Sequence, residues 1–206
     1  MLVIGLSGTV ASGKNLVADI FKSFGANIFD ADLVVSKILE QDHSIISQIS
    51  RYFDGSVVNG KINRRKLAQL VFSNKEKLDI LEKIIHPKVT GARKNFILQA
   101  KRVKKDLIIL NIPLLFEKDI YKECDYNILV KSTYSLQKER FIKRELSRNI
   151  EFEVAELSEK FDKILQNQSN NTQKEIFADF ILQNNQDKDI LIKNVKEIFN
   201  KLIKND

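Results

Sequence analysis

Hydrophobic and polar positions are grouped in blocks along this chain, and the blocks predict short buried strands separated by helices. Apolar runs of strand length occur at Met1–Ser7, Ala26–Phe29, Leu107–Ile112, Tyr126–Val130 and Phe180–Leu182. Consecutive apolar positions, rather than alternating ones, are typical of strands in a parallel sheet that is covered on both faces. The pattern therefore predicts an α/β fold with a parallel sheet of about five strands.

The intervals between these runs have helical character. Lys14–Phe24 carries apolar residues at helical spacing, and Gly25 follows as a typical helix stop. The interval 33–102 is predicted to be mostly helical, and Ser135–Leu165 reads as a charged helical stretch. Asp54-Gly55 and Asn59-Gly60 are turn signals between helices or around a small hairpin. The tail Asp189–Ile203 is expected to pack on the body through one apolar stripe: Ile190, Leu191, Val195, Ile198, Phe199 and Leu202.

Composition narrows the class of protein. The chain has 206 residues, 43% of them hydrophobic, with only 7 Gly and 2 Pro, which predicts one ordinary domain without linkers. A lone cysteine, Cys124, excludes an internal disulfide and a cysteine zinc site, and suits a reducing cytosol. The apolar runs Met1–Leu6 and Leu107–Phe116 are too short for a signal peptide or a membrane span. We therefore expect a cytoplasmic protein.

The net charge of +7 is distributed unevenly along the chain. Residues 1–50 contain three lysines and five acidic residues, a balance of −2, so the remainder carries +9. A basic surplus favours anionic partners, either nucleic acid or phosphorylated small molecules. A lysine-rich surface without any such partner is the alternative, and charge alone does not separate these interpretations.

Residues Gly8–Lys14 fit the phosphate-binding pattern G-x-x-x-x-G-K. Backbone N–H groups of such a loop curl around phosphate oxygens, and the following helix adds its positive N-terminal end. The alternative, a glycine-containing turn without a ligand, is disfavoured because the motif follows a buried strand and opens a helix. Asn15 stands where the motif normally has Ser or Thr for Mg²⁺, although an amide oxygen also ligates hard cations.

Two carboxylates follow the second predicted strand. Asp30 and Asp32 come directly after Ala26–Phe29, and ligands of such sheets bind beyond the carboxyl ends of the strands. A carboxylate there could orient an attacking hydroxyl toward the γ-phosphate. The alternative is that one of them caps the next helix, since Asp is a favoured N-cap residue. We favour one functional aspartate.

Several further motifs, taken together, resemble the dephospho-coenzyme A kinase family over nearly the whole chain. The Ile85-His86-Pro87 and Pro113–Glu117 (PLLFE) elements are more specific to that family than the loop alone. The segments that carry the resemblance are Ile4–Lys14, Phe29–Asp32, Ile62–Arg64 with Leu67 and Val71-Phe72, Ile85–Pro87, Ile112–Glu117, Arg140 with Arg144, Gln168, Ala178–Ile181 and Asn184.

The resemblance implies a P-loop kinase-like three-layer fold with a helical acceptor-binding insertion and a helical lid. The nucleotide-binding core would comprise residues 1–32, 104–131 and 178–206. Residues 33–103 would form the largely helical acceptor-binding region, and residues 132–177 the lid. The implied reaction is phosphorylation of the 3′-hydroxyl of dephospho-coenzyme A by ATP with Mg²⁺, the last step of coenzyme A biosynthesis.

The resemblance also assigns roles to individual residues. Asp32 would engage the acceptor hydroxyl, Lys14 the phosphates, and Arg140 the transferring charge from the lid. Asn15 would serve the metal. The ATP side would comprise Gly8, Ala11, Ser12, Gly13, Lys14, Asn15, Leu16, Arg144 and Asn184. The acceptor side would comprise Asp32, Arg64, His86, Pro113, Leu114, Leu115 and Glu117.

Two of these roles have plainer alternatives. Arg140, Arg144 and Arg148 recur every four residues, which equally describes a solvated basic helix face. His86 precedes a proline, which predicts an extended residue at a helix break. Because phosphoryl transfer needs little general-base strength, we assign His86 to binding rather than to proton transfer.

The chain departs from the family pattern at two places. Thr9, Ala11, Asn15 and Leu16 replace the second Gly, third Gly, Ser and Thr of the family loop. Asn171 and Lys174 stand where the family often has two arginines, and lysine keeps the charge without the planar fork.

Other functions stay open at this point. One is a P-loop kinase for a nucleoside or another hydroxylated metabolite, and another is a non-catalytic nucleotide-binding or nucleic-acid-binding protein. The leading interpretation has ATP and dephospho-coenzyme A as partners, with neither nucleic acid nor membrane. Both a monomer and a trimer agree with the sequence.

Overall fold

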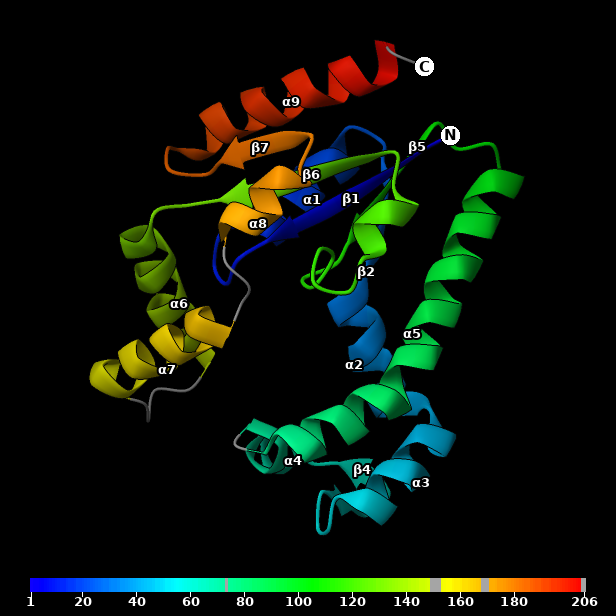
Figure 1. The fold of residues 1–206 in the computed structure, drawn as a ribbon, viewed down its shortest axis with the longest axis vertical. Helices are drawn as coiled ribbons and strands as arrows, with labels where there is room; N and C mark the ends of the chain where they lie inside the picture. Colours follow the sequence, from blue (N-terminus) through cyan, green and yellow to red (C-terminus); the bar gives the residue numbers. More distant parts are fainter. Residues whose placement is uncertain (73, 149–152, 168–170, 205–206) are drawn as a thin grey trace. The chain divides into compact units, whose positions relative to one another are not determined.

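The computed structural model describes residues 1–72, 74–148, 153–167 and 171–204, which form two compact units. Residues 1–29 and 100–206 belong to the first, here called the sheet unit. Residues 30–99 form the second, here called the helical unit. Figure 1 draws both units along the chain.

The described residues of the sheet unit form a five-stranded sheet in the order β2-β5-β1-β6-β7. Strand β1 pairs in parallel with β5 and β6, and β6 pairs in parallel with β7. In this register Ile4 lies beside Ile109, and Leu6 beside Ile128. All five predicted strands are confirmed, with bounds Leu2–Gly8 (β1), Asn27–Asp30 (β2), Leu107–Asn111 (β5), Tyr126–Lys131 (β6) and Phe180–Gln183 (β7).

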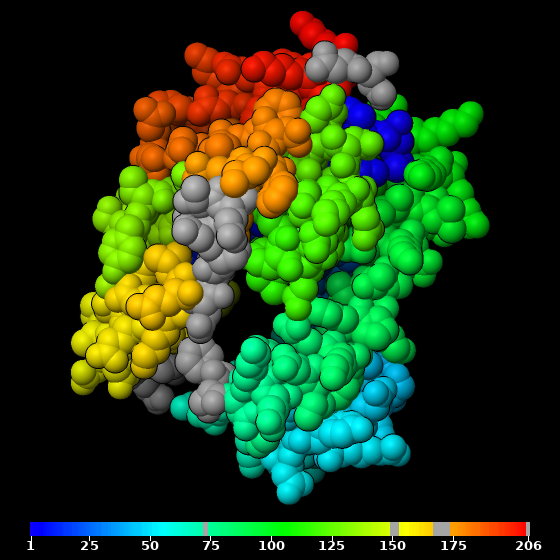
Figure 2. Space-filling view, viewed as in Figure 1, coloured from blue at the N-terminus to red at the C-terminus, as the bar shows by residue number. Residues whose placement is uncertain are grey.

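One face of this sheet is covered by α1 (Lys14–Ser23) and α9 (Lys188–Lys204). Alternate strand residues point into this layer, as Ile4 and Leu6 do from β1. The predicted stripe of α9 is confirmed at its four buried positions, Leu191, Val195, Ile198 and Leu202. The prediction that Ile190 belongs to the packed stripe is wrong, because this residue lies in the first turn of α9 and is 36% exposed. Figure 2 shows the outer surface of α9 in orange to red.

The opposite face is covered by residues 112–124, which include the short helix η1 (Ile120–Glu123), and by α8 (Asn171–Ile176). Tyr121 stacks on Phe177, with ring centroids 4.6 Å apart. Gly5 permits this close layer, since a Cβ there would lie 2.7 Å from Leu115 Cδ2 and 2.5 Å from Asn127 Oδ1. The glycine before the loop therefore has a packing role.

The described parts of the predicted helical stretch 135–165 form two helices, α6 (Tyr134–Arg148) and α7 (Val154–Asn167), and residues 149–152 lie outside the described residues. They pack through the buried residues Phe141, Leu157 and Phe161. At their edge Lys138 Nζ lies 3.0 Å from Asp162 Oδ2, and the Tyr134 hydroxyl donates to Asp162 Oδ1 at 2.6 Å. The hydrogen bonds from Tyr134 and Lys138 hold the pKa of Asp162 below its ordinary value. The pKa of Lys138 is raised by its hydrogen bond to the Tyr134 hydroxyl, at 2.9 Å, and by Asp162.

In its described residues, which exclude residue 73, the helical unit contains four helices and a small hairpin. Their bounds are α2 Ala31–Gln41, α3 His43–Tyr52, β3 Val57–Val58, β4 Lys61–Ile62, α4 Arg64–Phe72 and α5 Lys75–Arg102. The core of this unit is Ile45, Ile49, Phe53 and Leu67. Asn59 and Gly60 both have positive φ, 51° and 74°, as a two-residue hairpin turn requires. The hairpin alternative for these turn signals is thus confirmed.

The predicted helix break at His86-Pro87 is wrong, because α5 continues through both residues. A proline inside a helix removes one hydrogen bond to the carbonyl four residues earlier. Here Lys83, whose carbonyl loses this bond, and Pro87 are both exposed, so the carbonyl is on the side of the helix that water can reach, while Ile85 is buried. Figure 1 shows that α5 is bent, which is a common effect of proline within a helix.

Asp42 connects two helices of this unit. Its carboxylate caps α3 by accepting from the backbone N–H groups of Ser44 and Ile45. Lys88 Nζ lies 2.8 Å from the other oxygen, and this contact holds the pKa of Asp42 well below its usual range.

No helix in the described part of the chain is long and apolar enough to cross a membrane.

Candidate active site

The predicted phosphate loop joins the carboxyl end of β1 to the N-terminus of α1. Ser12 N–H donates to the Thr9 carbonyl at 3.1 Å, which closes a tight turn. Ala11 and Gly13 have left-handed backbone conformations, with φ of 55° and 94°. Left-handed residues within such a turn direct successive N–H groups toward one side, where they form an anion-binding concavity. The loop thus has the geometry that its sequence predicts.

Both glycines of the motif are required by their surroundings. A Cβ on Gly13 would lie 2.1 Å from Asn184 Nδ2, and a Cβ on Gly8 would lie 2.6 Å from Ser12 Oγ. Asn184 is buried directly after β7 and donates from Nδ2 to the Ser12 carbonyl at 2.8 Å. Ser12 Oγ is a buried hydroxyl that makes no hydrogen bond within the described residues, which leaves its O–H able to donate to a phosphate oxygen. Asn184 therefore braces the loop, in addition to its predicted position near adenine.

A chain of amides surrounds the loop lysine. Lys14 Nζ donates to Asn111 Oδ1 at 2.5 Å, and Asn111 Nδ2 donates to Asn15 Oδ1 at 3.2 Å. Asn111 is the last residue of β5, the strand beside β1, and is fully buried. Sequence analysis missed this residue. The available signal was one polar residue at the carboxyl end of an apolar strand, where ligands of such sheets bind.

The first half of the loop contacts α6 and α7. Gln137 is buried in α6, and its Nε2 donates to Thr9 Oγ1 at 2.8 Å and to the Ser132 carbonyl at 3.0 Å. Val10 and Ala11 pack against the apolar cluster between the two helices. Sequence analysis also missed Gln137, because a buried glutamine on a charged helix gives no periodic signal.

The three predicted lid arginines differ in their contacts. Arg140 Nη1 donates to Ser132 Oγ at 3.1 Å, and this hydroxyl donates to the Asn184 carbonyl at 2.9 Å. Arg140 is thus linked to the residue that braces the loop. Arg144 and Arg148 instead pair with Glu145, at 3.3 and 3.4 Å. The solvated-face interpretation fits these two, and the predicted ATP contact of Arg144 remains untested.

The PLLFE segment lies beside β1 in the same unit. Ser7 Oγ donates to the Pro113 carbonyl at 3.0 Å, which attaches the segment to the strand before the loop. Leu115 is fully buried, whereas Leu114 is 37% exposed and is therefore the leucine suited to contact an acceptor. Glu117 Oε1 lies 2.7 Å from Nζ of Lys174, whose side chain is 1% exposed.

Lys174 thus forms an ion pair inside the protein in this structure, at a position where the family often has an arginine. Neither Nζ nor the two Glu117 oxygens makes a hydrogen bond within the described residues, so the contact is ionic rather than directional. Gln168 and the side chain of Asn171 lie outside the described residues.

The remaining predicted residues belong to the helical unit. Asp30 is the N-cap of α2, since its Oδ1 accepts from Leu33 N–H at 2.9 Å. Of the two aspartates, Asp30 is therefore the one that caps the helix, and Asp32 lies in the first turn of the same helix. Arg64 Nη2 donates to the Ser36 carbonyl at 2.9 Å, and His86 is exposed on α5.

The residue that the sequence predicts to serve a metal is Asn15. Among the described residues, no group of three or more His, Cys, Asp or Glu could hold an ion. Asn15 is exposed at the start of α1, and its Oδ1 accepts one hydrogen bond from Asn111. A carbonyl oxygen has two lone pairs, so the second lone pair fits a cation or a water on it.

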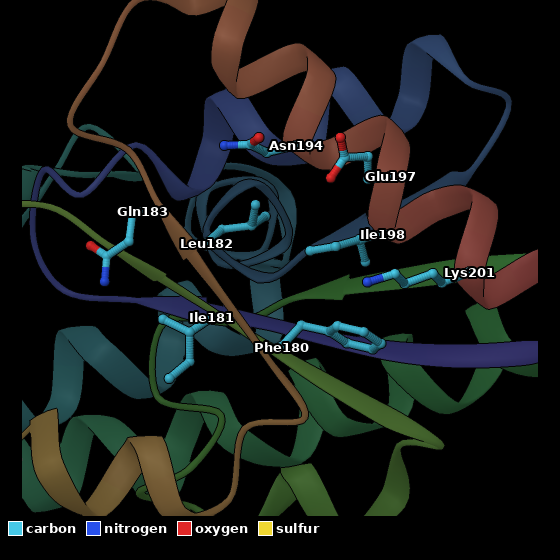
Figure 3. A pocket seen from close by; sticks show the side chains of 8 residues that line it. All are labelled: Phe180, Ile181, Leu182, Gln183, Asn194, Glu197, Ile198 and Lys201. Carbon is cyan, nitrogen blue, oxygen red and sulfur yellow. The ribbon is translucent and has the colours of Figure 1, made fainter.

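A separate groove of about 310 Å³ lies between α9 and β7, and β7 is the edge strand of the sheet (Figure 3). Its walls are Phe180 to Gln183 of β7 and four residues of α9: Asn194, Glu197, Ile198 and Lys201. None of the predicted site residues lines this groove. The phosphate loop, rather than the groove, is therefore the candidate active site.

A parallel sheet with this loop, a lysine at its end and an arginine-bearing helix pair defines a P-loop kinase. The family model for dephospho-CoA kinase matches residues 2–189. The chain belongs to the dephospho-CoA kinase family.

Individual relatives agree with this family. A dephospho-CoA kinase of Bartonella quintana is 38% identical over 206 residues, which cover 100% of both chains. One of Fusobacterium nucleatum is 38% identical, covering 95% of this chain and 96% of that protein.

Solved structures agree on the fold. The crystal structure of TT1252 from Thermus thermophilus has a TM-score of 0.77 at 28% identity, covering 98% of this chain and 97% of that one. A dephospho-CoA kinase from Campylobacter jejuni has a TM-score of 0.70 at 23% identity, covering 98% of each chain. The predicted P-loop kinase fold is thus confirmed.

Proposed function

We propose that this protein transfers the γ-phosphoryl group of ATP to the 3′-hydroxyl of dephospho-coenzyme A, giving coenzyme A and ADP. The observation that carries the proposal is the braced loop Gly8–Lys14 with its lysine, in a chain that matches the family along its length. This reaction needs positioning and charge stabilisation more than covalent chemistry, and fixed N–H groups and cations provide both.

The residues of the sheet unit would act on the nucleotide. The loop N–H groups and Lys14 hold the outer phosphates, and Arg140 stabilises charge that develops on the transferring group. Asn15 would hold Mg²⁺ or its water through Oδ1. When bound, the ion neutralises charge on the phosphate oxygens. Closure of α6 and α7 over the nucleotide would exclude water from the transferring group.

The acceptor residues are proposed from the family resemblance. Asp32 would accept a hydrogen bond from the 3′-hydroxyl and orient its oxygen for attack in line with the leaving ADP. Arg64, His86 and the segment Pro113–Glu117 would bind the rest of the acceptor, with Leu114 rather than Leu115 in direct contact. We also propose a cytoplasmic location, which the single Cys124 suits.

A coupled assay for ADP formation tests the proposal, with ATP, Mg²⁺ and either dephospho-coenzyme A or a panel of nucleosides. We expect turnover with dephospho-coenzyme A. Turnover with a nucleoside alone would indicate a different P-loop kinase. Nucleotide binding without transfer to any acceptor would indicate a non-catalytic protein.

Two substitutions test the residue roles. Asp32→Asn should abolish transfer while ATP affinity is retained, with Asp19→Asn on exposed α1 as the matched control. Arg140→Gln should depress both transfer and ATP hydrolysis without acceptor, by a factor of about 10³. Arg148→Gln, two turns further along α6, should leave both transfer and ATP hydrolysis nearly unchanged. Equal effects of the two arginine changes would contradict the role of Arg140.

A further inference from the structure

Ser132 is the first residue after β6, at the point where the chain leaves the sheet for α6. Its hydroxyl lies 3.1 Å from Arg140 Nη1, 2.9 Å from the Asn184 carbonyl and 3.1 Å from Asn185 Oδ1. A guanidinium group only donates, so the hydroxyl accepts from Arg140, and its single hydrogen is directed at the two asparagines. The hydroxyl therefore joins Arg140 to the residues that follow β7.

The position of the Ser132 hydroxyl is fixed because both neighbours of Ser132 in the chain are bonded to the same two asparagines. Asn184 N–H donates to the Lys131 carbonyl at 2.8 Å, which extends the pairing of β6 with β7. On the other side, Thr133 N–H donates to Asn185 Oδ1 at 2.9 Å. The hydroxyl is thus held by the sheet rather than by the helix that follows it.

The same connection leads to the phosphate loop. Asn184, whose carbonyl accepts from the Ser132 hydroxyl, donates from Nδ2 to the Ser12 carbonyl at 2.8 Å. Asn184 and Ser132 thus connect the loop backbone to the Arg140 guanidinium. Stabilisation of transition-state charge depends on donors that are in place before the reaction, and a misplacement of about 1 Å costs roughly a hundredfold in rate.

The nature of the contact suits Arg140 for a phosphate. A hydroxyl is neutral, so it orients the guanidinium without cancelling its charge. A guanidinium also has several N–H donors, so the bond from Nη1 leaves others for phosphate oxygens. Arg144 and Arg148, further along α6, meet the carboxylate of Glu145 instead.

We propose that Ser132 is a positioning residue that holds the Arg140 guanidinium in register with the phosphate loop. It acts through Arg140 and touches neither substrate. This inference rests on the proposed function, because it requires that Arg140 stabilises charge on the transferring phosphoryl group.

Steady-state kinetics with ATP, Mg²⁺ and dephospho-coenzyme A test the inference. Ser132→Ala should lower kcat about tenfold or more, and should lower ATP hydrolysis without acceptor by a similar factor. The dissociation constant of a non-hydrolysable ATP analogue, measured by calorimetry, should change by less than about threefold. Ser147→Ala is the matched control: it removes an exposed hydroxyl of α6, which donates to the Arg144 carbonyl, and should leave all three quantities unchanged.

A double-mutant cycle separates positioning from a purely structural role of Ser132. In the Arg140→Met background, Ser132→Ala should change kcat by less than about twofold, because the group that Ser132 positions is gone. Ser132→Thr and Ser132→Val form an isosteric pair that differs in the hydroxyl. Ser132→Thr should keep kcat within about threefold of the natural value, whereas Ser132→Val should lower it as Ser132→Ala does.

Thermal unfolding of each variant reports whether the fold is kept, and the isosteric pair provides the comparison if Ser132→Ala is unstable. The inference is overturned if Ser132→Ala lowers kcat by the same factor in the natural and Arg140→Met backgrounds, or if Ser132→Val is as active as Ser132→Thr. Natural activity of Arg140→Met would overturn it as well. Absence of turnover by the natural chain would overturn the proposed function itself, and this inference with it.

Discussion

The two halves of the phosphate loop are anchored to different parts of the sheet unit. The inner half, Ser12–Asn15, is attached to the ends of two strands through Asn184 and Asn111. The outer half, Thr9–Ala11, is attached to α6 and α7 through Gln137 and apolar contacts. The half that carries the lysine is thus fixed by the sheet, and the other half is coupled to the helix pair proposed as the lid.

The outer half is also where the chain departs from the family pattern. Thr9 and Ala11 stand in place of two glycines, and both side chains contact the helix pair. Ala11 adopts a left-handed conformation with φ of 55°, which costs a non-glycine residue roughly 1 kcal/mol. The contacts with α6 and α7 offset this cost. We therefore expect the inner half to determine phosphate binding and the outer half to respond to changes in α6 and α7.

The largest effect is expected from Gly13→Ala in the inner half. The added Cβ would overlap Asn184 Nδ2 at 2.1 Å, and the backbone has φ of 94°. We expect loss of about 2–4 kcal/mol in the free energy of unfolding and at least about a hundredfold loss of ATP affinity. Denaturant unfolding and calorimetry measure the two quantities.

Gly25→Ala is the matched control for this change. Its φ of 96° is nearly the same as that of Gly13, but nothing lies within 4 Å of the added Cβ. It should cost only the backbone strain of about 1–2 kcal/mol and leave ATP affinity unchanged. Combining Gly13→Ala with Asn184→Gly should recover part of the stability that the overlap removes. Equal losses in the two glycine variants would refute the steric explanation.

A smaller effect is expected from Gln137→Leu in the outer half. It removes the hydrogen bonds to Thr9 and Ser132 and should destabilise the protein by about 1–2 kcal/mol. Amide hydrogen exchange should rise at residues 9–11 and stay nearly constant at residues 12–15. Gln166→Leu, on the exposed side of α7, should leave both halves unchanged. Equal increases in both halves would contradict the separate anchoring.

The smallest expected effect is a change in how the free energy of unfolding depends on pH. It comes from Asp162, at the edge of the helix pair α6 and α7. Hydrogen bonds from Tyr134 and Lys138 lower the pKa of Asp162, so its contribution to stability is present above the ordinary aspartate pKa of about 3.9. This contribution is lost as the pH falls through the lowered pKa.

The free energies of unfolding of the Asp162→Asn variant and of the natural chain should therefore differ at neutral pH and become equal as the pH is lowered. Asp19→Asn, on α1, should keep the same small difference at both pH values. A difference for Asp162→Asn that persists at low pH would exclude the carboxylate as its source.

The strands and the loop could be predicted because their signals are local. Five consecutive apolar runs and the G-x-x-x-x-G-K spacing depend on neighbouring residues only, and their positions are confirmed. The helix break at His86-Pro87 could not be judged locally, since the packing of Ile85 and the solvent beside Pro87 decide whether the helix continues.

The supports of the loop could not be predicted for a related reason. Asn111 and Gln137 are separated from their loop partners Lys14 and Thr9 by 97 and 128 residues. A single buried amide has no sequence pattern, and only the parallel order of the strands brings Asn111 beside the loop. From the sequence, either Asp30 or Asp32 could be the N-cap residue of the next helix. The hydrogen bond from Leu33 N–H to Asp30 Oδ1 shows that it is Asp30.

The ion pair between Glu117 and Lys174 constrains how this chain can change during evolution. Losing one member of a buried pair leaves an uncompensated charge and typically costs about 3–5 kcal/mol, whereas replacing both by apolar residues of similar size is often tolerated. The PLLFE segment and α8 should therefore accept substitutions at these positions together rather than one at a time. Two segments distant in sequence are in this respect a single mutational unit.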